Sequence, residues 1–338
     1  MNFKNGHHEK MIQKKKVKSI ALQVLKLAFA FGILGYLIST GKIDLEKVLT
    51  VLTSSPWMFL ALSMGFFTLL TTTWRWRILL QTQGIRISFR KTLRLVFIGH
   101  FFNIVIPGTV SGDVVKAYYI TKSQTNKMAA GLSVFMDRFV GLIVLFVMTA
   151  VAMALNTAFV RSIPPLYMLA QIIFVGFIVL TVCFIFYLSK KEMILSQKWP
   201  PFFRKLVEAF WSYRNHLPAL FFASGLTTLN FFVNMTLYYA TILALGGETL
   251  PFTQYLFLIP IGMFAMSIPI APVGLGVGQG VFLKLFEWAH GKPITTGADM
   301  ITLVQLILIT WALVGSLVYI FHRQDVSIEA IEKQANLA

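Results

Sequence analysis

The most chemically distinctive part of the sequence is a short polar segment, from Asn103 to Lys116, at the end of an apolar stretch. It combines an amide, a hydroxyl, a carboxylate, a lysine and helix-breaking residues: Asn103, Pro107, Gly108, Ser111, Gly112, Asp113 and Lys116. Pro107 and Gly108 would end one helix, and the free amides at the next helix start can bind an anion such as phosphate. Because ionisable groups in an apolar membrane segment are costly, we interpret these residues as a substrate-binding site.

Asp113 also has a purely structural interpretation. A carboxylate close to a helix start interacts favourably with the helix dipole, so Asp113 would then act only as a cap. Lys116 follows one turn later and is predicted to pair with Asp113 in either case.

A second candidate is the neighbouring pair Asp137 and Arg138, inside the apolar run 131–155. Two charges in a spanning segment are costly unless they are paired. A position near the cytoplasmic end of the helix would let water reach them, but Asp137 lies about ten residues, or roughly 15 Å, into the predicted helix. We therefore expect an internal ion-pair network that touches the first segment.

A third candidate is a stretch rich in proline and glycine, with the site residues Pro272, Gly274, Gly276, Gly278 and Gln279. It lacks the Gly-Lys-Ser/Thr ending of a nucleotide-binding P-loop. Small residues also let membrane helices pack closely, which is the structural alternative. Glycines at every second position do not share one helix face, however, so we predict looped backbone over 272–280, with Gln279 as its polar side chain. Lys284 and Glu287 follow at a spacing that favours pairing.

The composition indicates that these candidate residues lie in a membrane-spanning domain. Of 338 residues, 57% are hydrophobic and 13% are charged, and mean hydropathy is +0.72. Soluble proteins carry about 25% charged residues. The plainest apolar runs cover 28–38, 57–70, 141–155, 166–188 and 301–321. Such runs are typical of bilayer-spanning helices, so the sequence predicts an all-α polytopic membrane protein with one integral domain, 20–321.

The distribution of basic residues predicts the topology. The formal net charge is +17, which we attribute to cytoplasmic loops and anionic lipid headgroups and not to nucleic acid. The positive-inside rule places 1–19, 74–94 and 189–216 in the cytoplasm, and it places 41–56, 156–165 and 247–254 outside. Six crossings follow: 20–40, 57–73, 128–155, 165–188, 218–245 and 299–321.

Two interrupted segments must then start and finish on the same side of the membrane. Residues 92–121 would enter from the cytoplasm, and residues 252–290 would enter from outside. Paired broken segments in corresponding halves indicate an inverted-repeat transporter with its substrate site at those segments. We predict two re-entrant hairpins of opposite orientation that meet near the midplane; eight kinked helices are the alternative.

Other segments are assigned more simply. Residues 196–215 have apolar residues at helical spacing and are predicted to form an amphipathic helix on the cytoplasmic leaflet, or a helix packed on the bundle. Residues 322–338 form a cytoplasmic tail. The run from Trp74 to Arg77 is interpreted as an interfacial anchor, with specific contact to a lipid headgroup as the alternative. The six histidines are scattered and Cys183 is the single cysteine, so no metal site, disulfide or cofactor is predicted.

The order and spacing of these motifs resemble one known family. The matching residues are Asn103, Pro107, Gly108, Gly112, Asp113, Lys116, Asp137, Arg138, Gly141, Pro269, Pro272, Gly274 and Gly276. With them the chain resembles the lysylphosphatidylglycerol synthase transmembrane region family over roughly residues 15–322. This flippase-like domain occurs in multiple peptide resistance factors and in stand-alone proteins. The family has an acidic residue near the position of Gln279, so the amide here departs from the pattern.

The resemblance implies a translocase for a lipid or a lipid-linked sugar and not an enzyme. The synthase activity belongs to a separate soluble domain, which the 17 residues after Phe321 are not expected to supply. We therefore expect an inner-membrane protein, with both termini cytoplasmic, that moves an anionic phospholipid or a polyprenyl-phosphate-linked glycolipid between leaflets. One alternative is a non-transporting accessory subunit of a membrane glycosyltransferase or other lipid-modifying enzyme, which would then be its partner. An enzyme acting on lipid phosphates is disfavoured, because no nucleophile–base pair is apparent.

Overall fold

The computed structural model describes residues 32, 35–106, 111–122, 127–189, 211, 213–246, 249–266 and 274–322. The predicted tail 1–19, most of segment 196–215 and the tail beyond 322 lie outside the described residues, as do Pro107, Gly108 and Pro272. The helices are α2 (Leu45–Ser54), α3 (Pro56–Thr82), α4 (Phe89–Val105), α5 (Ser111–Lys122), α6 (Lys127–Leu155), α7 (Thr157–Ser162), α8 (Pro164–Ser189), α11 (Leu217–Ala244), α12 (Phe252–Met266), α13 (Val277–His290) and α14 (Thr296–Phe321). A 3₁₀ helix, Tyr213–His216, precedes α11.

The described residues form helices and connections without a strand, which confirms an all-α membrane protein. Four helices are long and apolar enough to cross a bilayer, namely α3, α6, α11 and α14. They coincide with four of the predicted crossings. Helix α8, with 26 residues, covers the predicted crossing 165–188. The total of six crossings stays a prediction.

Local sequence signals set the helix starts. Pro56 occupies the first turn of α3. Proline is tolerated there because backbone N–H groups of the first turn make no intrahelical hydrogen bond. The Ser88 side chain accepts a hydrogen bond from the Lys91 amide and caps α4. Asp44 caps α2 in the same way, and its own amide donates to Asp299 Oδ1 on α14 at 2.9 Å. This last bond attaches the short helix α2 to the main bundle.

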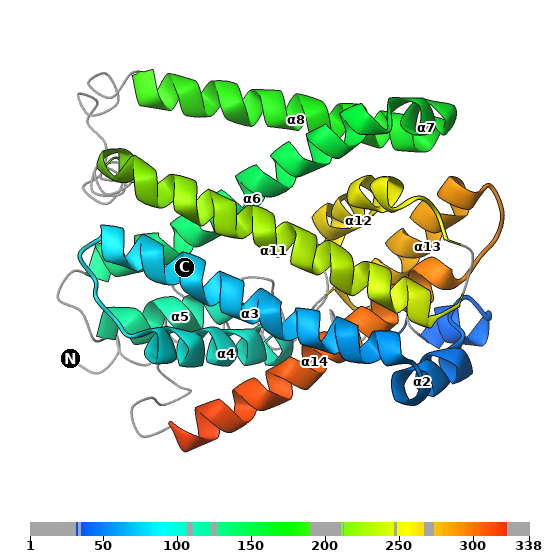
Figure 1. The fold of residues 1–338 in the computed structure, drawn as a ribbon, viewed down its shortest axis with the longest axis horizontal. Coiled ribbons are helices and arrows are strands. Elements are labelled where there is room, and N and C mark those ends of the chain that lie inside the picture. The colour runs from blue at the N-terminus through cyan, green and yellow to red at the C-terminus, as the bar shows by residue number, and fades with distance from the viewer. Residues whose placement is uncertain are drawn as a thin grey trace, which may run out of the picture.

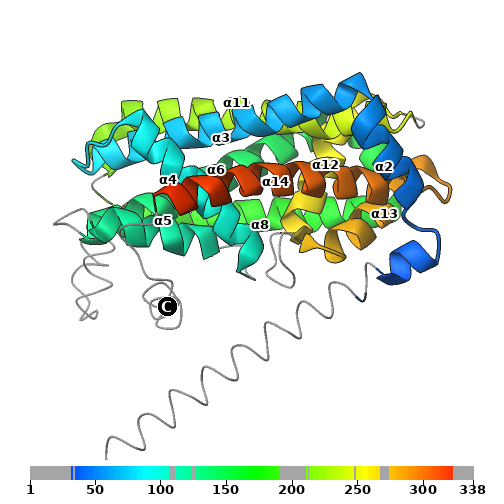
Figure 2. The ribbon, with the colours of Figure 1, turned by 90° about the horizontal axis from the view of Figure 1, so that it is seen from below.

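The long helices α3 and α11 lie side by side, with α6 and α14 packed against them (Figures 1 and 2). Helices α4 and α5 occupy one end of the bundle, and α12 and α13 occupy the opposite end. The long helix of each half packs on the broken segment of the other half: α14 contacts α4, and α6 contacts α12. The helices α3, α4, α5 and α6 can therefore be matched in order with α11, α12, α13 and α14. Each contact among these eight helices then has a counterpart in the other half.

Matched positions in the two broken segments extend this correspondence to single residues. Gly112 and Asp113 are the second and third residues of α5, as Gly278 and Gln279 are of α13. Gly99 is the eleventh residue of α4, as Gly262 is of α12. The packing supports the predicted inverted repeat, while re-entry of the segments into the bilayer stays a prediction. Their tips, 107–110 and 267–273, lie outside the described residues.

Glycine is required where α4 meets α5. A Cβ on Gly112 would overlap the Gly99 carbonyl group, and it would come within 2.9 Å of the Asn103 side chain. We expect Gly112→Ala to lower the free energy of unfolding by about 1–3 kcal/mol, the usual cost of overpacking. Thermal unfolding in detergent measures this, with Gly131→Ala as control, because a Cβ at Gly131 meets nothing within 4 Å. Equal unfolding temperatures for the Gly112 and Gly131 variants would show that α4 and α5 move apart to accept the added methyl group.

Candidate functional site

Five charged side chains meet where α3, α5 and α6 pack together. We call Arg75, Asp113, Lys116, Asp137 and Arg138 the charge cluster. Arg75 Nε lies 2.7 Å from Asp137 Oδ1, and Lys116 Nζ lies 2.8 Å from Asp113 Oδ1. Lys116 Nζ is also 4.0 Å from Asp137 Oδ2, and Arg138 Nε pairs with Asp113 Oδ2. The five groups thus form one connected network.

The cluster is buried except at one side. Arg75, Asp113, Lys116 and Asp137 are at most 8% exposed, whereas the Arg138 side chain is 51% exposed. Three cations face two carboxylates, so the cluster carries a net charge of +1. Removing charges from water costs several kcal/mol per ion, roughly, and complete pairing offsets that cost. The surplus positive charge gives the cluster the electrostatics of an anion-binding site.

Neighbouring polar and aromatic groups fix the orientation of the cations. Lys116 Nζ lies 5.1 Å from the centre of the Trp76 ring, a cation–π geometry. The Trp76 indole N–H donates to Ser133 Oγ at 3.2 Å. Arg75 Nη1 donates to Thr227 Oγ1 on α11 at 3.3 Å, which links the cluster to the second half of the chain.

The structure brings together several of the residues predicted from the sequence. The predicted Asp113–Lys116 pair is confirmed, and so is an ion-pair network that joins Asp137 and Arg138 to the first segment. Asn103 Oδ1 accepts a hydrogen bond from the Gly112 amide at 2.7 Å, and Ser111 Oγ donates to the Ile106 carbonyl at 3.0 Å. These two side chains hold the α4–α5 connection, beside the charges.

Sequence reasoning missed Arg75 and Trp76. The prediction that the run from Trp74 to Arg77 is an interfacial anchor is wrong for these two, because Arg75 and Trp76 are buried while Trp74 is exposed. Helix α3 continues to Thr82 through the apolar residues Ile78, Leu79 and Leu80. That continuation was the available signal, since it places Arg75 well inside a helix and not at its end.

A neutral counterpart of the cluster lies in the second half. The amide cluster consists of Gln279, Gln305 and Thr302. Gln279 Nε2 donates to Gln305 Oε1 at 2.5 Å and to Thr302 Oγ1 at 3.3 Å, while its Oε1 accepts from the Gly276 amide at 2.8 Å. Gln279 occupies on α13 the place of Asp113 on α5, and Gln305 lies on α14, the counterpart of α6. The two halves therefore share a geometry but not a charge.

The backbone before α13 agrees only in part with the predicted loop over 272–280. Gly274 and Gly276 have φ values of +69° and +75°, which favour glycine. From Val277 onward the chain is helical, so the looped backbone predicted for 277–280 is wrong. Gly278 packs closely, since a Cβ there would lie 3.1 Å from Met266 Sδ and 3.4 Å from Gln305 Nε2.

Gly276→Val tests this helix start. A β-branched residue at positive φ costs about 1–3 kcal/mol and would displace the amide that donates to Gln279. The sequence predicts lipid transport, and we expect this predicted activity to fall much more than the amount of protein in the membrane, both measured against Gly225→Ala, where a Cβ meets nothing within 4 Å. Transport equal to that of the parent protein would show that this segment is structural.

The described residues contain no group of three or more His, Cys, Asp or Glu side chains that would hold a metal ion.

The protein is 22% identical over 324 residues to a UPF0104 membrane protein from Methanothermobacter thermautotrophicus, and the alignment covers 86% of this chain and 88% of that protein. A family model described as the lysylphosphatidylglycerol synthase TM region matches residues 23–315, a range that includes α3 to α13 and most of α14. The chain therefore belongs to the lysylphosphatidylglycerol synthase TM region family.

Proposed function

We propose that this protein moves an anionic phospholipid or a polyprenyl-phosphate-linked glycolipid between the leaflets of the cell membrane. The observation that carries the proposal is the buried charge cluster, in which three cations meet two carboxylates. A lipid phosphate would complete the neutralisation. Its oxygens would accept hydrogen bonds from Arg138, which is half-exposed, and from Lys116 behind it.

The rest of the cluster would hold this site in place. The Arg75–Asp137 pair joins α3 to α6, and Arg75 also bonds to α11. Transport would follow from movement of the two halves against each other, the usual mode of inverted-repeat proteins. No bond is made or broken in this scheme, so we propose a transporter and not an enzyme, with no catalytic residue and no cofactor.

The proposed orientation has both termini in the cytoplasm. It is supported by the placement of α2 and α7, in the predicted outer connections, at the same end as α13 and opposite to α4 and α5 (Figure 1). Cysteine substitutions at Lys122 and Glu248, in a Cys183→Ser background, test it with a membrane-impermeant thiol reagent on intact cells. We expect labelling at position 248 and none at 122. The reverse pattern would overturn the topology.

Native mass spectrometry of the purified protein tests the proposed ligand class. The protein is expressed in a host whose membrane contains both zwitterionic and anionic phospholipids. We expect the retained lipids to be enriched in anionic species, and we expect Lys116→Gln to reduce that enrichment. Retention in proportion to membrane composition would contradict an anion-selective site.

A further inference from the structure

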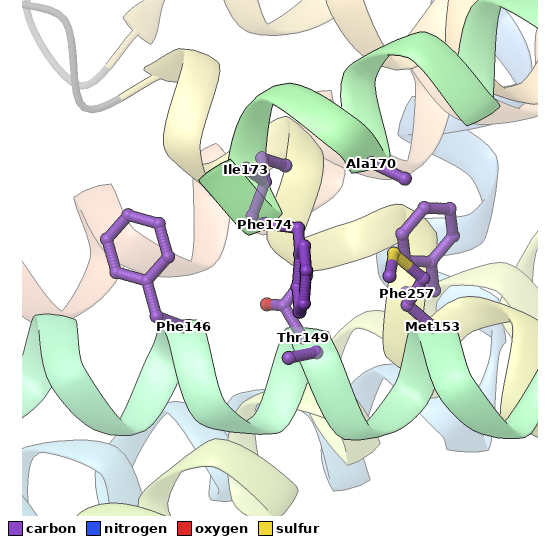
Figure 3. A pocket seen from close by; sticks show the side chains of 8 residues that line it. Phe146, Thr149, Met153, Ala170, Ile173, Phe174 and Phe257 are labelled. Carbon is purple, nitrogen blue, oxygen red and sulfur yellow. The ribbon is translucent and has the colours of Figure 1, made fainter. Parts of the chain in front are cut away.

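A groove runs between α6 and α8, away from the charge cluster. Its wider part is a cavity of about 250 Å³ whose lining is mostly apolar and includes the polar residues Thr157, Arg161 and Gln171. It narrows into a slot of about 10 Å³ lined by apolar residues of α6, α8 and α12 (Figure 3). Met153, Ala170 and Phe174 line both parts, so the cavity and the slot adjoin each other. We call the two together the α6–α8 groove.

The groove has the polarity and length of one lipid leaflet. Phe146 and Ile173 lie on the slot side, away from Met153 and Ala170 (Figure 3), whereas Arg161 and Gln171 line only the cavity. From Phe146 to the end of α6 at Leu155 the helix rises roughly 14 Å at 1.5 Å per residue. The hydrocarbon core is about 30 Å thick, so this matches half of it. In the predicted orientation, the wide end lies by the outer end of α6 and thus near headgroup depth.

Arg161 gives this end its charge. It is the single charged residue in the predicted outer connection 156–165, on the side where basic residues are sparse. It is exposed and lines the cavity, and it forms no ion pair with any residue that the structure describes. An arginine at a cavity that also presents Thr157 and Gln171 complements a phosphate group.

We propose that the α6–α8 groove binds one phospholipid of the outer leaflet with a negatively charged headgroup. The phosphate pairs with Arg161, the glycerol region fills the cavity, and an acyl chain follows the seam between α6 and α8 toward Phe146. This second lipid site shares no residue with the charge cluster. It does not depend on transport, although it uses the same predicted orientation.

Photo-crosslinking tests the site on the full chain in nanodiscs of phosphatidylcholine. The probe is phosphatidylglycerol with a diazirine on its acyl chain, and the labelled peptides are mapped by mass spectrometry. We expect label within 146–153 and 170–174. Arg161→Gln should reduce this label roughly tenfold, as for loss of one charge-assisted contact, and Arg161→Lys should retain much of it.

Ala170→Phe should also reduce the label, because Ala170 lines both cavity and slot. The matched control is Ile172→Phe on the same helix, an exposed position that lines neither part. If Ala170→Phe does not accumulate, the variants at the exposed residue Arg161 provide the test of lipid binding. Unchanged labelling in Arg161→Gln, or equal labelling by a phosphatidylcholine probe, would overturn the proposal. Because no lipid movement is measured, either result leaves the proposed transport untouched.

Discussion

Replacing Asp137 alone is expected to destabilise the fold strongly, whereas replacing Asp137 and Arg75 together should restore most of the stability. Asp137 is 2% exposed and is the ion-pair partner of the buried Arg75. Removing one member of a buried pair costs about 3–5 kcal/mol, because the other charge stays buried without compensation. Replacing both members by neutral groups is often close to neutral. The double variant Arg75→Gln/Asp137→Asn also leaves the net charge of the cluster at +1.

Fluorescence-detected size-exclusion chromatography after a temperature series measures this effect. We expect Asp137→Asn and Arg75→Gln each to lower the aggregation temperature strongly, and the double variant to recover most of the loss. Thr227→Val is a milder control, since it removes only one hydrogen bond to Arg75. If the double variant instead loses the sum of the two single-variant decreases in aggregation temperature, Arg75 and Asp137 act independently. Their ion pair would then not be the source of the stability.

Lys116→Gln is expected to abolish most transport while the protein still folds. This change brings the cluster from three cations and two carboxylates to two of each, so the surplus charge that would attract a phosphate is lost. A hydrogen bond to a charged group contributes about 1.5–3 kcal/mol. Binding of an anionic lipid should therefore weaken roughly tenfold to a hundredfold. Asp113 keeps Arg138 as its partner, which limits the loss of stability.

Two controls separate charge balance from general damage. Arg75→Gln/Asp137→Asn disrupts the network but keeps the net charge of +1, and it should transport better than Lys116→Gln. Lys284→Gln removes a lysine that pairs with Glu287 on an exposed face, and it should behave like the parent protein. Transport by Lys116→Gln at the parental rate would show that the surplus charge is not used.

The elements of the fold could be predicted from the sequence because the bilayer constrains them. Length, apolarity and basic-residue asymmetry identify helices such as α6 and α14 without any tertiary information. The Asp113–Lys116 pair was predictable for a similar reason, since it depends only on spacing within one helix. The connection of Asp137 and Arg138 to the first segment followed from the cost of isolated buried charges.

Contacts between distant helices could not be predicted in this way. Arg75 and Asp137 are 62 positions apart, and Gln279 and Gln305 are 26 positions apart. The apolar residues after Arg75 indicate that it lies inside a helix, but nothing in the local pattern identifies Asp137 as its partner until α6 is placed beside α3. The glycines before α13 illustrate the same limit. Their spacing indicated a loop through 280, but the helix begins at Val277, directly after Gly276, whose amide donates to Gln279.

The most direct test of the central claim is lipid movement across vesicles that contain the purified protein alone. Two fluorescent probes are used, phosphatidylglycerol and a polyprenyl-phosphate-linked sugar, and a membrane-impermeant quencher reports the accessible leaflet. We predict that the parent protein speeds the movement of at least one probe over protein-free vesicles, and that Lys116→Gln removes most of this gain. If neither probe moves faster than in protein-free vesicles, the protein does not transport these lipids by itself, and an accessory role beside a lipid-modifying enzyme takes the place of our proposal.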